Sequence, residues 1–302
     1  MVQRIPQAVA VALLLASASA GCATRAPTPA SGEPRTILWK DGVKNAYPRV
    51  SKDGSRILFQ SNRSGKWQLY VMNADGSGEV QLTQGDANNN FPDWSPDNSA
   101  VAFVSDRTGN EDIYVMNGDG SGVRALAPDP AQDIHPYWSP DGAQILFSST
   151  RAGGKLQIFR MDANGGHVEH LIVDGDDDTC SRVSPQGDRI VYLSNLAAGR
   201  DDVIVTDGDG KNPVNVTNDA APDGWPIWTP DGKRLVFASQ RAAPFALYVA
   251  NADGTNARQF TFPGSEDSDA RPSVSPDGKT VVFNRGRGEA TIGILSVALP
   301  PV

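Results

Sequence analysis

Carboxylates are the most concentrated reactive groups in this sequence. Thirteen of them fall in six short segments, "KDGVKNA", "QGDANNN", "PDPAQDI", "IVDGDDDT", "NDAAPDG" and "PGSEDSDA". These acids are Asp41, Asp86, Asp129, Asp133, Asp174, Asp176, Asp177, Asp178, Asp219, Asp223, Glu266, Asp267 and Asp269. Such a set can attract a basic protein or peptide, or supply oxygen ligands to a hard divalent cation. Because Asp is also a common turn former, ordinary polar loops are a third interpretation.

The densest acidic cluster, "DGDDD", is the best candidate for a metal site. Asp174, Asp176 and Asp178 would be the ligands of a Ca²⁺ ion. The cluster lacks the glycine and the distal glutamate of a helix-loop-helix calcium site, so we predict no cofactor and keep Ca²⁺ as an alternative.

Catalytic constellations are sparse. His167 and His170 lie in "HVEHL", where an offset of three places strand side chains on opposite faces, and His135 stands alone near acids. The sequence has no G-x-S-x-G motif of a serine hydrolase. We therefore predict a non-catalytic protein. The alternative is a metal-dependent polysaccharide lyase or hydrolase that uses His135 and the nearby acids.

A repeat of 44 to 46 residues must position these groups. Its most regular element is a Ser-Pro-Asp-Gly turn, which occurs as "SKDG" at 51, "SPDN" at 95, "SPDG" at 139, "SPQG" at 184, "TPDG" at 229 and "SPDG" at 275. Each copy reads as four strands, with a second hairpin at Asp-Gly or Asn-Gly pairs. The second strands are almost entirely apolar, as in "RILF" and "VAFV", which indicates a sheet covered on both faces. Periods of this length are typical of propellers and solenoids.

The two ends of the chain favour a closed ring. The sixth copy supplies three strands and stops, while "TILW" at 36–39 matches a fourth strand ahead of the first copy. Pairing the two ends would hide two sheet edges. The sequence predicts an all-β, six-bladed β-propeller over 35–302, with its last blade closed by the N-terminal strand.

These repeats resemble those of the TolB-like β-propeller family. The resemblance lies in the aromatic-Pro-x-Trp-Ser-Pro-Asp-Gly element, the apolar strand, Ser-x-Arg, and the "IYVMNGDG" type of ending. It implies a propeller that acts as a binding module in the cell envelope. TolB itself belongs to the Tol–Pal system and has an additional N-terminal domain, whereas this chain has a short tether there.

The propeller order predicts a binding surface at one channel mouth. The six acidic segments link the fourth strand of one blade to the first strand of the next, so they should gather on one face. Thirteen acids and two lysines give these links a charge of −11, whereas the whole chain carries −8. The residues that open the first strands vary and should encircle the same mouth: Tyr47, Phe91, His135, Cys180, Trp225 and Arg271. We predict that a partner with a basic surface binds to the members of this set other than Cys180, together with Asp133, Asp174, Asp176, Asp177, Asp178, Asp223, Asp267 and Asp269. Packing beneath the loops is an equally simple interpretation for the variable set.

Arginines recur at the second hairpin of most copies. They are Arg63, Arg107, Arg151, Arg241 and Arg287, with Leu196 in the fourth copy. Recurrence at the repeat period indicates a structural pairing, which we expect to involve a turn aspartate of an adjacent blade.

The first 34 residues read as an export signal and a tether. "MVQRIPQAVAVALLLASASAGC" has a charged start, an apolar stretch and small residues before Cys22, which fits a lipoprotein signal over 1–21 and lipidation of Cys22. The alternative is ordinary cleavage after Ala20, with an incidental cysteine. Residues 22–34 are rich in Pro and Ala and read as a flexible tether. We expect a monomer secreted through the inner membrane and held in the envelope by this lipid alone, on the periplasmic side of the outer membrane. The net charge of −8 argues against nucleic acid as a partner.

Overall fold

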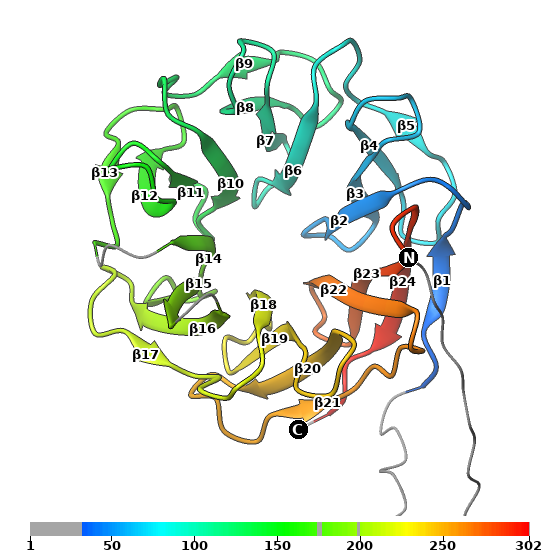
Figure 1. Ribbon diagram of the computed structural model, residues 1–302. Coiled ribbons are helices and arrows are strands. Elements are labelled where there is room, and N and C mark those ends of the chain that lie inside the picture. The colour runs from blue at the N-terminus through cyan, green and yellow to red at the C-terminus, as the bar shows by residue number, and fades with distance from the viewer. Residues whose placement is uncertain (1–31, 174–176, 198–199, 302) are drawn as a thin grey trace, which may run out of the picture.

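The structure is a computed structural model that describes residues 32–173, 177–197 and 200–301. Six four-stranded antiparallel sheets surround a central axis, which confirms the predicted six-bladed β-propeller (Figure 1). Within the described part of the chain, no helix is long and apolar enough to cross a membrane.

Each blade contributes one strand to each of four concentric positions. The innermost strands are β2 (Asn45–Val50), β6 (Asn89–Trp94), β10 (Asp133–Trp138), β14 (Asp178–Val183), β18 (Asp223–Trp228) and β22 (Asp267–Val274). The second strands are β3 (Arg56–Ser61), β7 (Ala100–Ser105), β11 (Gln144–Ser149), β15 (Arg189–Ala197), β19 (Arg234–Ser239) and β23 (Thr280–Arg287). The third strands are β4 (Gln68–Asn73), β8 (Asp112–Asn117), β12 (Gln157–Asp162), β16 (Arg200–Asp207), β20 (Ala246–Asn251) and β24 (Thr291–Ala298). The outer strands are β5 (Val80–Gln81), β9 (Arg124–Ala125), β13 (Glu169–His170), β17 (Val214–Asn215), β21 (Arg258–Gln259) and, in the last blade, β1 (Arg35–Leu38).

The N-terminal strand closes the ring. β1 pairs antiparallel with β24, with Arg35 opposite Ser296 and Leu38 opposite Ile294. The last blade is therefore built from both ends of the chain, as the repeat alignment predicts (Figure 1).

The core lies between neighbouring blades. One aromatic side chain of each second strand is almost completely buried: Phe59, Phe103, Phe147, Tyr192, Phe237 and Phe283. The apolar clusters around them join residues of two adjacent blades, as in the cluster that contains Val191 of β15 and Phe237 of β19. Burial on both faces explains why the second strands have no polar alternation.

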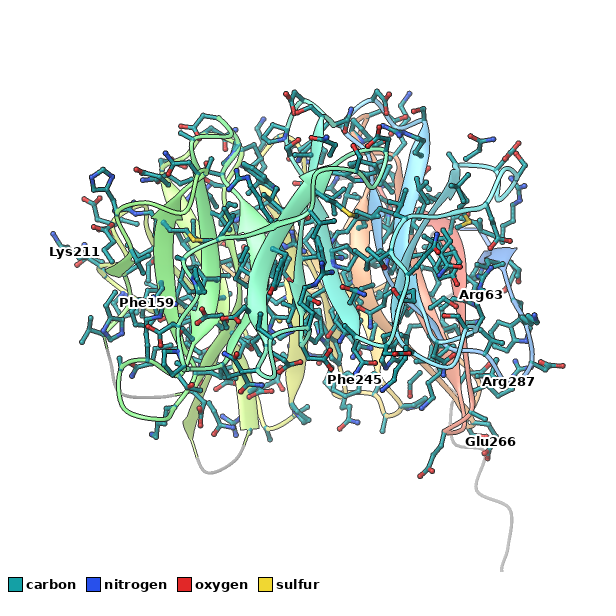
Figure 2. All side chains as sticks on the ribbon, turned by 90° about the horizontal axis from the view of Figure 1, so that it is seen from above. Arg63, Phe159, Lys211, Phe245, Glu266 and Arg287 are labelled. Atoms are coloured by element: carbon teal, nitrogen blue, oxygen red, sulfur yellow. The ribbon has the colours of Figure 1, made fainter. Side chains whose placement is uncertain are left out.

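The propeller has two chemically different faces. We call the face of the links between blades the link side, and the face of the Ser-Pro-Asp-Gly turns the turn side. Each innermost strand runs from the link side to the turn side. In the side view of Figure 2, Glu266 lies on the lower face, which is the link side.

Candidate functional site

Every innermost strand contains an irregularity at the same position. The register with the second strand shifts there, between Ala46 and Arg49 in the first blade and at matching positions in the others. One residue in each strand has a positive φ of 50° to 57°: Tyr47, Phe91, His135, Cys180, Trp225 and Arg271. A positive φ is uncommon for residues with a side chain, so its presence in all six blades marks a feature of the repeat.

These six residues close the channel. Phe91 contacts Tyr47 and His135, with ring centroids 4.8 and 4.4 Å apart, and the sulfur of Cys180 lies 3.8 Å from Nδ1 of His135. The guanidinium of Arg271 lies over the rings of Tyr47 and Trp225, at 4.4 and 4.6 Å from their centroids. We call this layer the plug. The structure thus brings the variable residues together around the axis, but they pack against one another, and partner binding by them stays a prediction.

Two titratable groups of the plug, His135 and Cys180, have pKa values shifted away from neutrality. Burial, together with the nearby guanidiniums of Arg271, Arg49 and Arg182, lowers the pKa of His135 to about 3. Burial also raises the pKa of the Cys180 thiol. Both groups are therefore neutral at pH 7, and the positive charge of this layer comes from Arg271.

A second layer of channel residues, next to the plug, contains two arginines and one aspartate. Asp93 lies between two arginines, with its Oδ1 atom 3.6 Å from Nε of Arg49 and 3.4 Å from Nη1 of Arg182. The guanidinium of Arg182 stacks on the ring of Tyr137 at 3.6 Å, and Nη2 of Arg49 donates a 3.4 Å hydrogen bond to the Tyr137 hydroxyl. We call Arg49, Asp93 and Arg182 the Arg–Asp–Arg cluster. The two guanidiniums and one carboxylate give it a net charge of +1.

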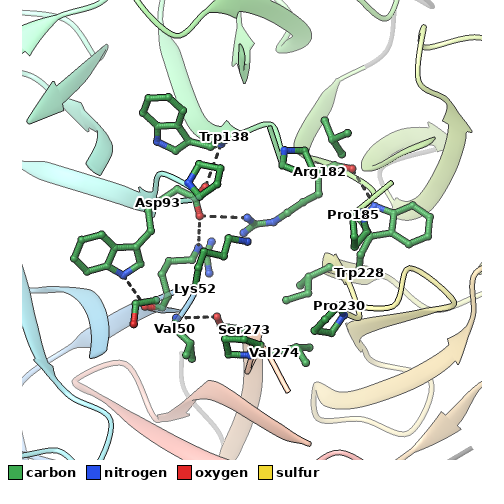
Figure 3. Close-up of a pocket in the computed structure, with 18 of the residues that line it drawn as sticks. Val50, Lys52, Asp93, Trp138, Arg182, Pro185, Trp228, Pro230, Ser273 and Val274 are labelled. Carbon is green, nitrogen blue, oxygen red and sulfur yellow. Dashed lines mark hydrogen bonds and ion pairs between the residues drawn. The ribbon is translucent and has the colours of Figure 1, made fainter. Parts of the chain in front are cut away.

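The cluster forms the floor of a cavity of about 390 Å³ that opens on the turn side (Figure 3). Residues from all six blades line this cavity, which we call the turn-side pocket. Its wall consists of the residues that end the innermost strands, namely Val50, Trp94, Trp138, Val183, Trp228 and Val274. Its rim consists of the second residue of each Ser-Pro-Asp-Gly turn, namely Lys52, Pro96, Pro140, Pro185, Pro230 and Pro276. The pocket is therefore apolar at its wall and cationic at its floor.

The predicted acidic mouth on the link side differs from what the sequence analysis expected. Five of its carboxylates are buried rather than exposed: Asp133, Asp178, Asp223, Asp267 and Asp269. Arg151, Arg241, Arg287 and Arg285 form ion pairs with Asp133, Asp223, Asp267 and Asp269 at 2.6 to 3.3 Å. Of the acids predicted in the links, Asp41, Asp86, Asp177 and Glu266 are exposed. The negative charge nearest the axis is thus largely neutralised by the protein itself.

The recurring arginines explain this burial. Each pairs with the residue that opens the innermost strand of its own blade, as in Arg63 with Asn45 at 2.8 Å and Arg107 with Asn89 at 2.9 Å. The recurring partner is therefore not the expected turn aspartate of an adjacent blade, because the second hairpin and the start of the innermost strand lie at the same end of one blade. Arg241 also pairs with Asp219, in the link that follows the preceding blade, at 2.5 Å. Desolvation raises the pKa of Asp133 to about 6, whereas hydrogen bonds from Arg287 lower the pKa of Asp267.

Some of the residues predicted to carry a lipid or to bind a metal lie outside the part of the chain that the structure describes. Cys22, Asp174 and Asp176 lie outside the described residues, and Asp178 is buried. Across 32–173, 177–197 and 200–301, no group of three or more His, Cys, Asp or Glu side chains has the arrangement of a metal site.

Comparison with known proteins agrees with this architecture. The sequence matches the TolB beta propeller domain over residues 30–128, 81–199 and 193–299. The chain belongs to the TolB β-propeller family. TolB from Acinetobacter baumannii superposes with a TM-score of 0.68 at 23% identity, over 77% of this chain and 57% of that one. The chain thus spans little more than half of that TolB.

Enzymes share the TolB-type propeller fold as well. An oligogalacturonate lyase in complex with manganese superposes with a TM-score of 0.61 at 15% identity, covering 90% of this chain and 97% of the lyase. At these identities the likeness shows the fold alone. The function of the chain must be argued from its own pocket.

Sequence reasoning missed the turn-side pocket. Its floor residues stand one position before the end of each innermost strand, where Arg49, Asp93, Arg182, Ile227 and Ser273 differ between blades although their neighbours recur. That variation is the signal that could have located the pocket. It was overlooked because the adjacent Ser-Pro-Asp-Gly turn has a sufficient structural explanation of its own.

Proposed function

We propose that this TolB-family propeller is a non-catalytic binding scaffold of the cell envelope that holds a segment of a protein or peptide partner in the turn-side pocket. The observation that carries this proposal is the position of the pocket on the propeller axis, where all six blades contribute to its lining. A site built from six repeats can present unlike groups to one ligand while the turns and cores of the repeats stay the same.

The dimensions and chemistry of the pocket support this function. A volume of about 390 Å³ falls within the usual range for ligand sites. The prolines of the rim and the valines of the wall give an apolar surface, and the Arg–Asp–Arg cluster gives a small number of oriented polar groups. Apolar walls with a few convergent polar groups are typical of binding pockets.

A pull-down from envelope extract tests the proposal. Val274→Trp should fill the pocket and abolish capture of a partner that wild-type protein retains. Val214→Trp is the matched control, because Val214 is 56% exposed on the outer strand β17. Capture that is equally strong with both variants, each shown to be folded by circular dichroism, would contradict the proposal.

The link side offers a second binding surface, for a basic protein or peptide. Its support is the set of exposed carboxylates of Asp41, Asp86, Asp177 and Glu266. Asn or Gln at these four positions should weaken such a partner most at low salt, because exposed charges act mainly through screened, long-range attraction. An affinity that is unchanged at every salt concentration would remove this surface from consideration.

The envelope location rests on the N-terminal sequence. We propose that Cys22 carries a lipid that anchors the propeller, as a monomer, to the periplasmic side of the outer membrane. Metabolic labelling with a radioactive fatty acid should mark the wild-type chain and leave Cys22→Ser unlabelled. Labelling of both proteins, or of neither, would contradict lipidation at Cys22.

A metal-dependent lyase or hydrolase is the alternative function, and the fold shared with the manganese-bound oligogalacturonate lyase is the observation that favours it. Incubation of the purified protein with oligogalacturonate and Mn²⁺, or with Ca²⁺, tests it directly. Unsaturated or shortened products would establish the enzymatic function, and elemental analysis of the same sample would identify a bound metal.

A further inference from the structure

The Arg–Asp–Arg cluster has more positive charge than the protein neutralises. One carboxylate oxygen, Oδ1 of Asp93, serves both Arg49 and Arg182, while Oδ2 accepts a 3.1 Å hydrogen bond from the backbone N–H of Trp138. As the single carboxylate of the cluster, Asp93 offsets one of the two guanidinium charges, which leaves a charge of +1 at the bottom of an apolar pocket. This excess stands out in a chain whose net charge is −8.

The two guanidiniums also have unused donor capacity. Arg49 is 6% exposed, and its Nη1 and Nη2 atoms donate to the Pro48 carbonyl and the Tyr137 hydroxyl, at 2.9 and 3.4 Å. Its Nε atom has no hydrogen-bond partner among the described residues. The hydrogen bond from Arg182 to Asp93 is 3.4 Å long, beyond the usual range. A guanidinium has five N–H donors, and leaving them unpaired at a buried position is costly. The floor of the pocket is therefore poised to accept an anionic oxygen pair.

Other groups near the floor do not supply that anion. His135 and Cys180 are neutral, and Arg271 adds a further positive charge in the plug below. Lys52 adds another at the rim. The charged residues that line the pocket therefore sum to +2, and the turn aspartates that follow the rim residues are not among the lining residues. Close to the floor, this lining favours a negatively charged group.

The wall of the pocket indicates what the anion is attached to. The hydroxyls of Ser51 and Ser139 donate to Asp53 and Asp141 of their own turns at 2.6 Å, and the Ser273 hydroxyl accepts from the backbone N–H of Val50 at 3.0 Å. The hydroxyl protons of Ser51 and Ser139 are therefore already used within the turns. The rest of the wall is mainly Val, Ile, Pro and Trp. Such a wall suits an apolar chain better than a sugar, whose many hydroxyls need hydrogen-bond partners.

We propose that the Arg–Asp–Arg cluster binds the carboxylate of a peptide whose adjoining side chains are apolar and occupy the turn-side pocket. This inference rests on the proposed function, since it names the group by which the partner is recognised. A carboxylate matches the planar donor pattern of arginine, and two arginines from different blades can hold both of its oxygens. Lys52 at the rim attracts the same charge during approach.

The test uses the purified full chain and two pooled sets of N-acetylated tripeptides of Ala, Val and Leu, one with free carboxylates and one with terminal amides. Binding is measured by equilibrium dialysis and by the fluorescence change of the wall tryptophans. We expect the carboxylate set to bind at least about tenfold more tightly than the amide set, as for other charge-assisted hydrogen bonds.

Two variants assign this preference to the cluster. Arg182→Gln should remove the preference, and Asp93→Asn should increase carboxylate affinity about tenfold, because it removes the internal competitor and raises the charge of the site. Arg124→Gln is the matched control, because Arg124 is exposed on the outer strand β9 and does not line the pocket. It should leave the preference unchanged.

The outcomes separate this inference from the proposed function. Equal binding of the two peptide sets by wild-type protein, or no gain from Asp93→Asn, overturns the carboxylate assignment even if Val274→Trp abolishes partner capture. Tighter binding of hexanoate or of trigalacturonate than of the peptide carboxylates overturns the peptide assignment. If Val274→Trp does not reduce partner capture and the wild-type protein does not bind the peptides, both the proposed function and the carboxylate assignment are overturned.

Discussion

Arg151 places its guanidinium 2.6 Å from the carboxylate of Asp133, the residue that opens the innermost strand of the same blade. In the first two blades an asparagine makes the same contact, since Oδ1 of Asn45 accepts from Arg63 and Oδ1 of Asn89 accepts from Arg107. The same hydrogen bond from the arginine therefore recurs in several blades, and its acceptor can be either a neutral amide or a charged carboxylate. This explains how a carboxylate can be tolerated at a position that is 1% exposed.

Because an asparagine can accept this hydrogen bond as well, Asp133→Asn should be tolerated. The amide should keep the bond to Arg151, so the free energy of unfolding at pH 7 should change by less than about 1 kcal/mol. Asp133→Ala leaves the arginine without its partner and should cost about 3 kcal/mol. Urea denaturation of the two variants and the wild type measures the difference. Equal destabilisation by both substitutions would show that the charge itself is required.

The same residue has a pH dependence of known sign. Burial raises the pKa of Asp133 from 3.8 to about 6, so the folded state binds the proton more tightly than the unfolded state between these values. This contribution to stability is complete below pH 3.8 and is lost as the pH rises through 6. The unfolding free energy of the wild type, relative to that of Asp133→Asn, should therefore decrease between pH 4 and pH 7. A difference that does not vary with pH would contradict the raised pKa.

Alanine substitutions at two glycines of the second blade can distinguish the cost of backbone strain from the cost of a steric clash between blades. Gly109 and Gly120 have positive φ values of 103° and 90°, so alanine is strained at both. An added Cβ at Gly109 meets nothing within 4 Å, whereas at Gly120 it comes to 2.7 Å from the carbonyl oxygen of Leu82 in the preceding blade. Gly109→Ala should cost about 1 kcal/mol and Gly120→Ala about 2 kcal/mol more. Thermal and urea unfolding measure the loss of stability in the two variants. Equal losses would mean that the two blades can move apart at Gly120 without a free-energy cost.

Removal of the closing strand tests how much the ring depends on its own ends. A chain starting at residue 40 lacks β1 and exposes the edge of β24, together with the apolar surface that Ile37 and Leu38 partly cover. We expect a loss of roughly 3 kcal/mol in the free energy of unfolding, and self-association through the free edge. A chain starting at residue 32 is the control, and it should behave like the longer protein. Unchanged stability of the shorter chain would show that the pairing of β1 with β24 contributes little.

The sequence was sufficient for the fold because its signals are local and repeated. A Pro-Asp-Gly turn, an apolar second strand and an Asp-Gly hairpin each constrain a few residues, and six copies leave few arrangements other than a ring. The alignment of 36–39 with the fourth strands also predicted the closure. These features depend on spacing, which a sequence displays directly.

Exposure in the site could not be predicted in the same way. Asp133 and Asp223 stand in polar segments and read as surface residues, yet arginines 18 positions later cover them. The turn-side pocket depends on Arg49, Asp93 and Arg182 meeting from three different blades. Contacts between blades depend on the radius of the ring and on the bulge in each innermost strand. The residue spacing within one repeat predicts neither of them.

The Ser-Pro-Asp-Gly turns should give the protein a defined sensitivity to acid. The Asp97 carboxylate accepts hydrogen bonds from the hydroxyl of Ser95 at 2.6 Å and from the backbone N–H of Ser99 at 3.0 Å. These bonds lower the pKa of Asp97 to about 2. Since the folded pKa is depressed, the contribution of Asp97 to stability is present above pH 4 and is lost as the pH falls toward 2. Asp97→Asn should therefore be less stable than wild type at pH 7 and equal to it near pH 2 in urea denaturation. A difference that persists at pH 2 would assign the effect to packing.

The thiol of Cys180 should report the integrity of the plug. Cys180 is 3% exposed, its sulfur lies 3.8 Å from Nδ1 of His135, and burial raises its pKa. In a Cys22→Ser background, a disulfide reagent at pH 8 should therefore modify Cys180 only at the rate of unfolding. His135→Ala removes the side chain that covers the sulfur and should increase the rate at least about tenfold without unfolding the blades, because the plug opens locally. Arg271→Lys, at the other side of the plug, should leave the rate unchanged. Rapid modification of Cys180 in the otherwise unaltered protein would mean that the channel is open from the link side.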